Sequence, residues 1–331
     1  MKPAVLVCRR IFPDVLARLE EHFALETNDA DVVWSREEFV HRLQGKAGVY
    51  VTGTQPIDAE LLVACPELRA VCSLAVGYNN IDVPACTARG VMVSNAPGVL
   101  TETTADFGFA LLMATARRIT ESERFLRRGE WEKWSVDLFD GADVHGATLG
   151  ILGMGRIGQG VARRGAKGFG MPVIYHNRSR LDAATEAELG ARYVAKAELL
   201  ATADHLVIVV PYTAESHHLV GAAELAQMKP GATLVNIARG GVVDDVALAA
   251  ALREGRLAAA GLDVFEGEPT VHRDLLALSN VVLTPHIASA SLPTRRAMAH
   301  LAASNLIAAL AAGGNRQPPT PLNPQTLPLA L

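Results

Sequence analysis

Residues 148–158 read Thr-Leu-Gly-Ile-Leu-Gly-Met-Gly-Arg-Ile-Gly, and this stretch decides the fold. Its first five residues predict a short buried strand and residues 159–169 predict a helix, so the glycines lie on a strand-to-helix turn. There the first glycine permits the bend, the second lets backbone approach a pyrophosphate, and the third lets helix pack on strand. An ordinary glycine-rich turn is the alternative, but the flanking strand and helix favour a dinucleotide site. Its predicted residues are Gly153, Gly155, Arg156, Ile157 and Gly158.

The segment after the next predicted strand, residues 172–176, bears on the choice of cofactor. NAD-binding units usually carry an acidic residue there for the ribose hydroxyls, about 20 residues after the glycines. This chain instead has Asn177-Arg178-Ser179-Arg180. The arginines can pair with a 2′-phosphate and the serine can donate another hydrogen bond; the alternative is that the two arginines are only solvated in a surface loop. We therefore predict NADP(H) as the preferred cofactor and leave the use of NAD(H) open.

Composition narrows the class of protein. A chain of 331 residues, 50% of them hydrophobic, is long enough for about two domains. A formal net charge of −4 and the lack of a long basic run argue against nucleic acid or a membrane as partner. No leader or spanning segment is recognised, so we expect a cytoplasmic protein that acts on a small molecule. The four cysteines, and the pair His217-His218, lack metal-ligand spacing, so no metal is predicted.

The order of the predicted elements gives an α/β fold with parallel sheets. Residues 1–97 alternate short apolar runs with helical patterns. A capping-box pattern at 103–106 then predicts a helix that runs to about Arg127 and leads into a second domain. Further strands alternate with helices and predict a sheet covered on both faces; they lie at 206–210, 233–237, 259–264 and 281–284.

We therefore predict two Rossmann-like domains. The doubly wound dinucleotide-binding domain covers residues 101–286, and a smaller flavodoxin-like substrate domain combines residues 1–100 with residues 287–331. A last helix at 294–311 returns to the substrate domain, and the proline-rich tail after it is left unstructured. The ligand site is expected in the cleft between the domains, at the carboxyl ends of the strands.

Three chemically useful side chains follow successive predicted strands: Arg239, Glu268 and His286. Each alone could be a surface charge or a structural histidine. Together they form the set that hydride transfer to a 2-keto acid needs. The guanidinium binds the substrate carboxylate, the imidazole protonates the developing alkoxide, and the carboxylate keeps that proton donor protonated. We therefore predict that Arg239, His286 and Glu268 fill these catalytic roles.

The chain resembles the D-2-hydroxyacid dehydrogenase family along essentially its whole length. Within that family it is most similar to bacterial glyoxylate/hydroxypyruvate reductases that also act on 2-ketoaldonates such as 2-ketogluconate. The motifs that carry the resemblance are residues 74–82, 153–158, 236–240, 261–269 and 285–287.

The resemblance implies further site residues. The backbone N–H groups of Val76 and Gly77 are expected to hold the substrate carboxylate together with Arg239, and Asp263 to bind the nicotinamide carboxamide. Glu268 is expected to pair with His286. Besides the residues already named, the implied cofactor contacts are Thr104, Val210, Pro211, Ala238, Arg239, His286 and Ser289.

The resemblance also implies a homodimer whose contact includes the segment 131–145, with Trp131 and Trp134 as anchors. Two alternatives remain at this stage. One is an enzyme of the same fold with another substrate, such as phosphite; a formate dehydrogenase is disfavoured because those enzymes pair their histidine with glutamine. The other is a non-catalytic, NAD(P)-sensing protein similar to a transcriptional corepressor.

Overall fold

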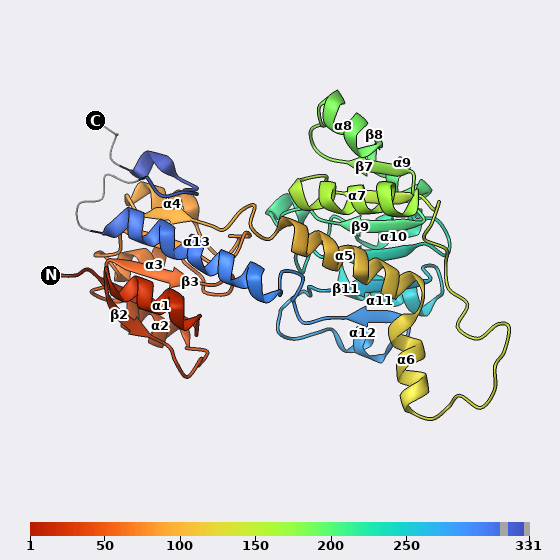
Figure 1. Cartoon of the computed structure of the whole chain (residues 1–331), viewed down its shortest axis with the longest axis horizontal. Helices are drawn as coiled ribbons and strands as arrows, with labels where there is room; N and C mark the ends of the chain where they lie inside the picture. The colour runs from red at the N-terminus through yellow and green to blue at the C-terminus, as the bar shows by residue number, and fades with distance from the viewer. Residues whose placement is uncertain (312–316, 328–331) are drawn as a thin grey trace. The chain divides into compact units, whose positions relative to one another are not determined.

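The computed structural model describes residues 1–311 and 317–327, and the chain divides into two compact units. The first unit combines residues 1–100 with 291–331, and the second holds residues 101–290. Each is built around one parallel sheet, which confirms the predicted α/β class (Figure 1). Residues 287–290, assigned to the substrate domain from the sequence, stay with the second unit. They do so because the amides of Ile287 and Ala288 donate hydrogen bonds to the buried Asp263.

The first unit has five parallel strands in the order β2-β1-β3-β4-β5. They are β1 Ala4–Val7, β2 Ala24–Thr27, β3 Gly48–Val51, β4 Ala70–Ser73 and β5 Met92–Ser94. The helices of this unit are α1 Pro13–Glu20, α2 Arg36–Leu43, α3 Ala59–Ala64, α4 Val83–Ala88 and α13 Leu292–Leu310. Because both faces of the central strands are buried, these strands are almost continuously apolar in sequence, which is why most of them could be predicted.

Two apolar layers make up the core of this unit, one on each face of the sheet. Helices α2, α3 and α4 cover one face, and α1 and α13 cover the other. Close approach of α13 depends on Gly48, where an added Cβ would meet the side chains of Leu306 and Leu310. Helix α13 therefore returns to the first unit, as predicted.

The described part of the proline-rich tail is ordered, contrary to the prediction. Pro321 forms an antiparallel bridge with Ser94, and a short 3₁₀ turn, η2, spans Pro324–Thr326. The buried Asn323 accepts a hydrogen bond from the Val93 amide at 2.7 Å and donates one to the Val91 carbonyl at 2.9 Å. The Leu322 amide also donates to the Val93 carbonyl at 2.8 Å, so the tail segment and its asparagine together satisfy the free edge at β5, which composition alone could not reveal.

The second unit has seven parallel strands in the order β12-β11-β10-β9-β6-β7-β8. They are β6 Leu149–Leu152, β7 Val173–His176, β8 Ala191–Tyr193, β9 His205–Ile208, β10 Thr233–Asn236, β11 Ala259–Leu262 and β12 Val281–Leu283. The helices are α5 Thr101–Ala116, α6 Ile119–Arg127, α7 Arg156–Phe169, α8 Ala183–Leu189, α9 Lys196–Thr202, α10 Ala222–Gln227, α11 Asp245–Arg253 and α12 Arg273–Ala277, with a 3₁₀ turn η1 at Ala214–Ser216.

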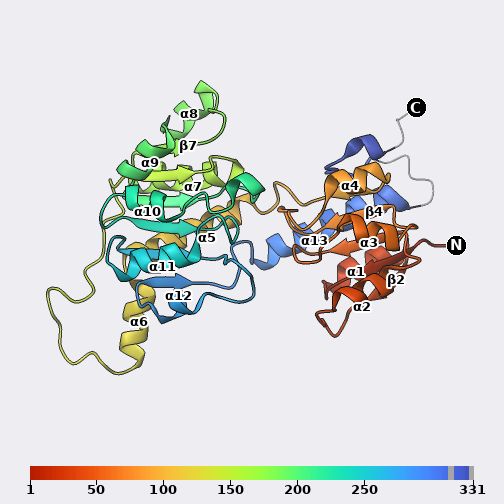
Figure 2. The same ribbon diagram turned by 180° about the vertical axis from the view of Figure 1, so that it is seen from behind.

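Helices cover both faces of this sheet. Helices α5 and α7 pack on one face, and α9, α10 and α11 pack on the other (Figures 1 and 2). The chain runs from β6 outward to β8 and then returns to β9 on the other side of β6. The order of strands therefore reverses between β6 and β9, and in doubly wound sheets ligands bind at such a point, outside the carboxyl ends of the strands.

One predicted helix differs from the structure. The capping-box prediction at 103–106 is wrong, because α5 begins at Thr101 and residues 103–106 lie within it. The helix also ends at Ala116, since Arg118 adopts a left-handed backbone conformation with φ of 52° before α6 begins. Thr104 is consequently buried in the helix, where its hydroxyl has no hydrogen-bond partner among the described residues.

Candidate active site

The glycine turn after β6 has the geometry of a phosphate cradle. Gly153 has φ of 103°, and a Cβ there would lie 2.7–2.8 Å from backbone atoms of Val209 and Val210. At Gly158 a Cβ would meet the carbonyl oxygen of Gly153, so this glycine lets α7 pack on the turn. A Cβ at Gly155 would instead meet open space, directly before the first turn of α7. Free space at a helix N-terminus with unpaired N–H groups suits an anion such as a pyrophosphate.

The loop after β7 holds the residues predicted to select the cofactor. Asn177 accepts a hydrogen bond from the Met154 amide at 2.6 Å, so its side chain supports the glycine turn. Arg178 and Ser179 are exposed at the tip of this loop. The charge of Arg178 contributes to a lowered pKa of Glu215, after the hydrogen bond from Thr213 and a backbone hydrogen bond.

Arg180 in the same loop is already paired. It donates two hydrogen bonds to Glu186, at 2.9 and 2.6 Å, and Tyr175 donates a third to the same carboxylate at 2.6 Å. The hydrogen bonds from Arg180 and then Tyr175 lower the pKa of Glu186 to about 2. Sequence analysis missed this partner, six residues after Arg180 and at the start of a helix that it did not predict.

The predicted catalytic side chains meet at the carboxyl ends of adjacent strands. Arg239 follows β10, Glu268 follows β11 and His286 follows β12. Nδ1 of His286 lies 2.8 Å from Oε2 of Glu268, and the other carboxylate oxygen accepts the Phe265 amide at 2.9 Å. Because Nδ1 is engaged, Nε2 is the nitrogen left for proton transfer.

The charges of this trio are coupled. Burial alone would raise the pKa of Glu268, but the hydrogen bond and charge of His286, the Phe265 amide and the charge of Arg239 together lower it. Burial lowers the pKa of Arg239, and the charge of Glu268 acts against that shift. Glu268 is therefore ionised at neutral pH and stands between two groups that can carry positive charge.

Gly240 allows the two loops to approach. A Cβ at this position would overlap the carbonyl of Phe265, so only glycine lets the loop of Arg239 lie against the loop that ends in Glu268. Asp263 fixes the third loop: its carboxylate accepts hydrogen bonds from the amides of Ile287 and Ala288, both at 2.8 Å, and from the Thr284 hydroxyl at 2.7 Å. Burial outweighs these hydrogen bonds and raises the pKa of Asp263. Asp263 thus positions the segment of His286, a contact that the sequence did not indicate.

A family model for the NAD binding domain of D-isomer specific 2-hydroxyacid dehydrogenases matches residues 109–288. The chain belongs to the D-isomer specific 2-hydroxyacid dehydrogenase family. This confirms the resemblance seen in the sequence, and the protein is an NAD(P)-dependent oxidoreductase.

Individual relatives are similar in sequence to this dehydrogenase over nearly its full length. A glyoxylate reductase of Korarchaeum cryptofilum is 51% identical over 93% of both chains. A glyoxylate reductase of Thermococcus onnurineus is 47% identical over 99% of this chain and 98% of its own. Among solved structures, an NADPH-dependent glyoxylate/hydroxypyruvate reductase of Sinorhizobium meliloti, in complex with NADP and malonate, is 36% identical with a TM-score of 0.85 and covers 99% of this chain and 98% of its own.

The other predicted site residues of the dehydrogenase lie at strand ends of one unit or the other. Val76 and Gly77 are in the first unit, in the loop after β4, where the Val76 carbonyl accepts a hydrogen bond from the Asn95 side chain at 2.7 Å. The remaining residues belong to the second unit: Val210 and Pro211 follow β9, Ala238 follows β10, and Ser289 follows His286.

Two further expectations concern ligands and membranes. All four cysteines of the dehydrogenase are free and buried, and burial raises the pKa of each thiol. His217 and His218 have no carboxylate at ligand spacing in the sequence, but the fold brings Oε2 of Glu266 to 3.0 Å from Nε2 of His218. No helix in the described part of the chain is long and apolar enough to cross a membrane.

Proposed function

We propose that this protein reduces small 2-keto acids, such as glyoxylate, hydroxypyruvate and 2-ketogluconate, to D-2-hydroxy acids with NADPH. The observation that carries the proposal is the pairing of His286 with Glu268 at 2.8 Å, at strand ends next to that of Arg239. This set supplies a carboxylate clamp and a charge-stabilised proton donor.

Each residue of the trio has one role in the proposed reaction. Arg239 binds the substrate carboxylate with its planar guanidinium. When NADPH is bound, its nicotinamide supplies a hydride to the carbonyl carbon. His286 donates its proton from Nε2 to the carbonyl oxygen, and Glu268 stabilises the imidazolium before the transfer. Hydride and proton together convert the carbonyl into the hydroxyl of the product.

The residues around the glycine turn fit such a cofactor. Open space at Gly155 leaves room for the pyrophosphate at the N-terminus of α7, and the unpaired hydroxyl of Thr104 is a buried donor without a partner among the described residues. Arg178 and Ser179 are exposed where a 2′-phosphate would bind, and no acidic side chain follows β7 directly. These features support preference for NADP(H) over NAD(H).

Steady-state oxidation of NADPH, followed by absorbance, tests the proposal. Glyoxylate, hydroxypyruvate and 2-ketogluconate are compared in parallel, with NADH as the control cofactor. We expect turnover with at least one acid and a higher kcat/KM with NADPH than with NADH. Tight NADPH binding without turnover of any acid would reject the reductase and favour phosphite oxidation or cofactor sensing.

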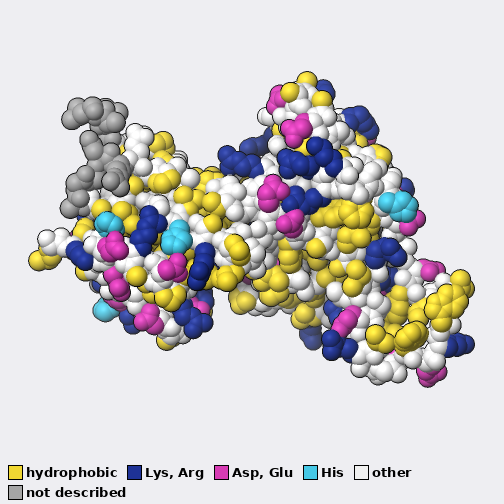
Figure 3. All heavy atoms as spheres, in the orientation of Figure 1, with side chains coloured by type: hydrophobic (Ala, Val, Ile, Leu, Met, Phe, Trp, Pro, Cys, Tyr) yellow, Lys and Arg dark blue, Asp and Glu magenta, His cyan; other side chains and the backbone are white. Residues whose placement is uncertain are grey.

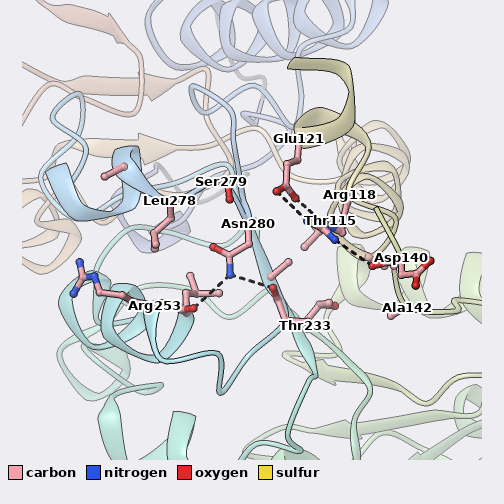
Figure 4. Close-up of a pocket in the computed structure, with 16 residues that line it drawn as sticks. Thr115, Arg118, Glu121, Asp140, Ala142, Thr233, Arg253, Leu278, Ser279 and Asn280 are labelled. Carbon is pink, nitrogen blue, oxygen red and sulfur yellow. Dashed lines mark hydrogen bonds and ion pairs between the residues drawn. The ribbon is translucent and has the colours of Figure 1, made fainter. Parts of the chain in front are cut away.

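We also propose that the protein is a homodimer that uses the loop between α6 and β6. This loop exposes Trp131, Trp134 and Val136, and Figure 3 shows apolar side chains gathered over it. A cavity of about 760 Å³ adjoins the same loop at Asp140–Ala142 (Figure 4). It lies at the amino ends of β10 to β12, whereas the catalytic trio follows the carboxyl ends of these strands. Light scattering should give twice the chain mass for the wild type and a smaller mass for W131S/W134S; a monomeric wild type would reject this proposal.

A further inference from the structure

A second cluster of ionisable side chains lies beside the catalytic loops. One ring nitrogen of His217, one of His218 and a carboxylate oxygen of Glu266 all lie within 4.8 Å of one another among the described residues. The histidines follow the turn η1 and Glu266 follows β11. Because 48 residues separate His218 from Glu266, only the fold brings these ligands together.

The cluster is close to the dimensions of a metal centre. With metal–ligand bonds of about 2.0–2.2 Å, the ligand atoms of a tetrahedral ion are about 3.3–3.6 Å apart. Nε2 of His218 and Oε2 of Glu266 are hydrogen-bonded at 3.0 Å, so the two atoms need to move apart by only a few tenths of an ångström to share an ion. The ring of His217 stacks on that of His218 with the ring centroids 3.9 Å apart, and its side chain is exposed to solvent.

The surroundings of both rings suit metal ligands. A ligating imidazole usually donates the N–H of its other nitrogen to an oxygen that accepts it and so orients the ring. The Tyr212 hydroxyl lies 3.2 Å from Nδ1 of His217, and a carboxylate oxygen of Asp244 lies 3.7 Å from Nδ1 of His218. The His218 amide also donates to the Gly241 carbonyl at 2.7 Å, which fixes the loop against the one that carries Arg239.

We propose that His217, His218 and Glu266 form a binding site for a divalent transition-metal ion of the Zn²⁺ class. Two imidazoles and one carboxylate are a donor set that Zn²⁺ accepts with one position left open, whereas Mg²⁺ and Ca²⁺ prefer oxygen ligands alone. Glu266 stands two residues before Glu268, and Gly241 stands two residues after Arg239. A bound ion therefore ties the segment of His217 and His218 to the loop that carries Glu268, and the hydrogen bond from His218 to Gly241 already joins that segment to the loop of Arg239.

Calorimetric titration of ZnCl₂ into the tag-free, EDTA-treated full-length protein tests this site. We expect one saturable site, and a loss of affinity of about tenfold or more in both H218Q and E266Q, since even outer-shell partners of a metal are worth about 10- to 100-fold. The matched control is H300Q, because Nε2 of His300 also lies 2.9 Å from a carboxylate, that of Asp14, on an exposed surface. H300Q should bind Zn²⁺ as the wild type does.

A further variant separates this site from the catalytic pair. H286Q should lose turnover but keep the Zn²⁺ affinity, so the result does not depend on the proposed reductase activity. Far-UV circular dichroism and melting in the absence of metal establish that each variant is folded. If H218Q is not folded, the isosteric variant E266Q alone decides whether the site exists. Absence of saturable binding, unchanged affinity in E266Q, or loss of affinity in H286Q alone would overturn the proposal.

Discussion

Arg178 and Arg180 should contribute unequally to NADPH binding. Arg180 commits its guanidinium to Glu186 through hydrogen bonds of 2.9 and 2.6 Å, whereas Arg178 is exposed at the loop tip. A hydrogen bond to a charged group is worth about 1.5–3 kcal/mol. Its loss in R178A should therefore raise the KM for NADPH by about 10- to 150-fold. The KM for NADH should not change, because NADH has no 2′-phosphate.

The assay measures initial rates with each cofactor varied at saturating glyoxylate. R192A is the matched control, since Arg192 is an exposed arginine on the neighbouring strand β8, paired with Glu198 at 2.8 Å. R180A should show a smaller rise in KM but a lower melting temperature, because the buried Glu186 loses its ionic partner. An equal rise in KM for both cofactors in R178A, or the same rise in R192A, would refute this reasoning.

Three other substitutions test the glycine turn, the catalytic pair and the tail. Gly153→Ala should abolish NADPH binding in calorimetry, because its Cβ would lie 2.7–2.8 Å from the Val209 and Val210 backbone; normal binding would contradict the proposed cradle. Glu268→Gln should lower kcat about tenfold, because a neutral hydrogen-bond acceptor replaces a charged one. In the wild type, turnover should persist as the pH falls through the ordinary range of carboxyl pKa values. It should be lost only below that range, because the pKa of Glu268 is lowered in the folded protein. A kcat that does not change with pH down to the pH at which the protein unfolds would exclude ionised Glu268 as the partner of His286 in catalysis. Asn323→Ala should cost about 1–3 kcal/mol in denaturant unfolding, because the Val93 amide and the Val91 carbonyl lose their side-chain partner, whereas the exposed Gln325→Ala should change stability by less than about 0.5 kcal/mol.

Sequence patterns predicted most strands of both sheets, because parallel strands buried on both faces must be apolar. They missed the edge strands β2 and β8, in which no residue is fully buried. They also located the glycine turn, where sterics at Gly153 and Gly158 leave no alternative to glycine. The pairing of His286 with Glu268 was expected from the resemblance, and the geometry agrees with it.

Long-range polar contacts could not be predicted in this way. The partners Arg180 and Glu186 stand six residues apart across a turn, and His218 reaches Glu266 over 48 residues. Asn323 lies in a proline-rich segment without periodicity, yet its amide completes the edge of β5. Such contacts depend on single side chains and on the path of the backbone, and neither leaves a periodic signal.

The most direct test of the central claim compares NADPH-dependent reduction of glyoxylate by the wild type and H286N. The account predicts measurable turnover by the wild type and a kcat about 10²- to 10⁴-fold lower in H286N, with NADPH affinity retained, since the histidine supplies general acid catalysis. An H286N variant with a kcat close to that of the wild type would contradict the assignment of His286 as the proton donor.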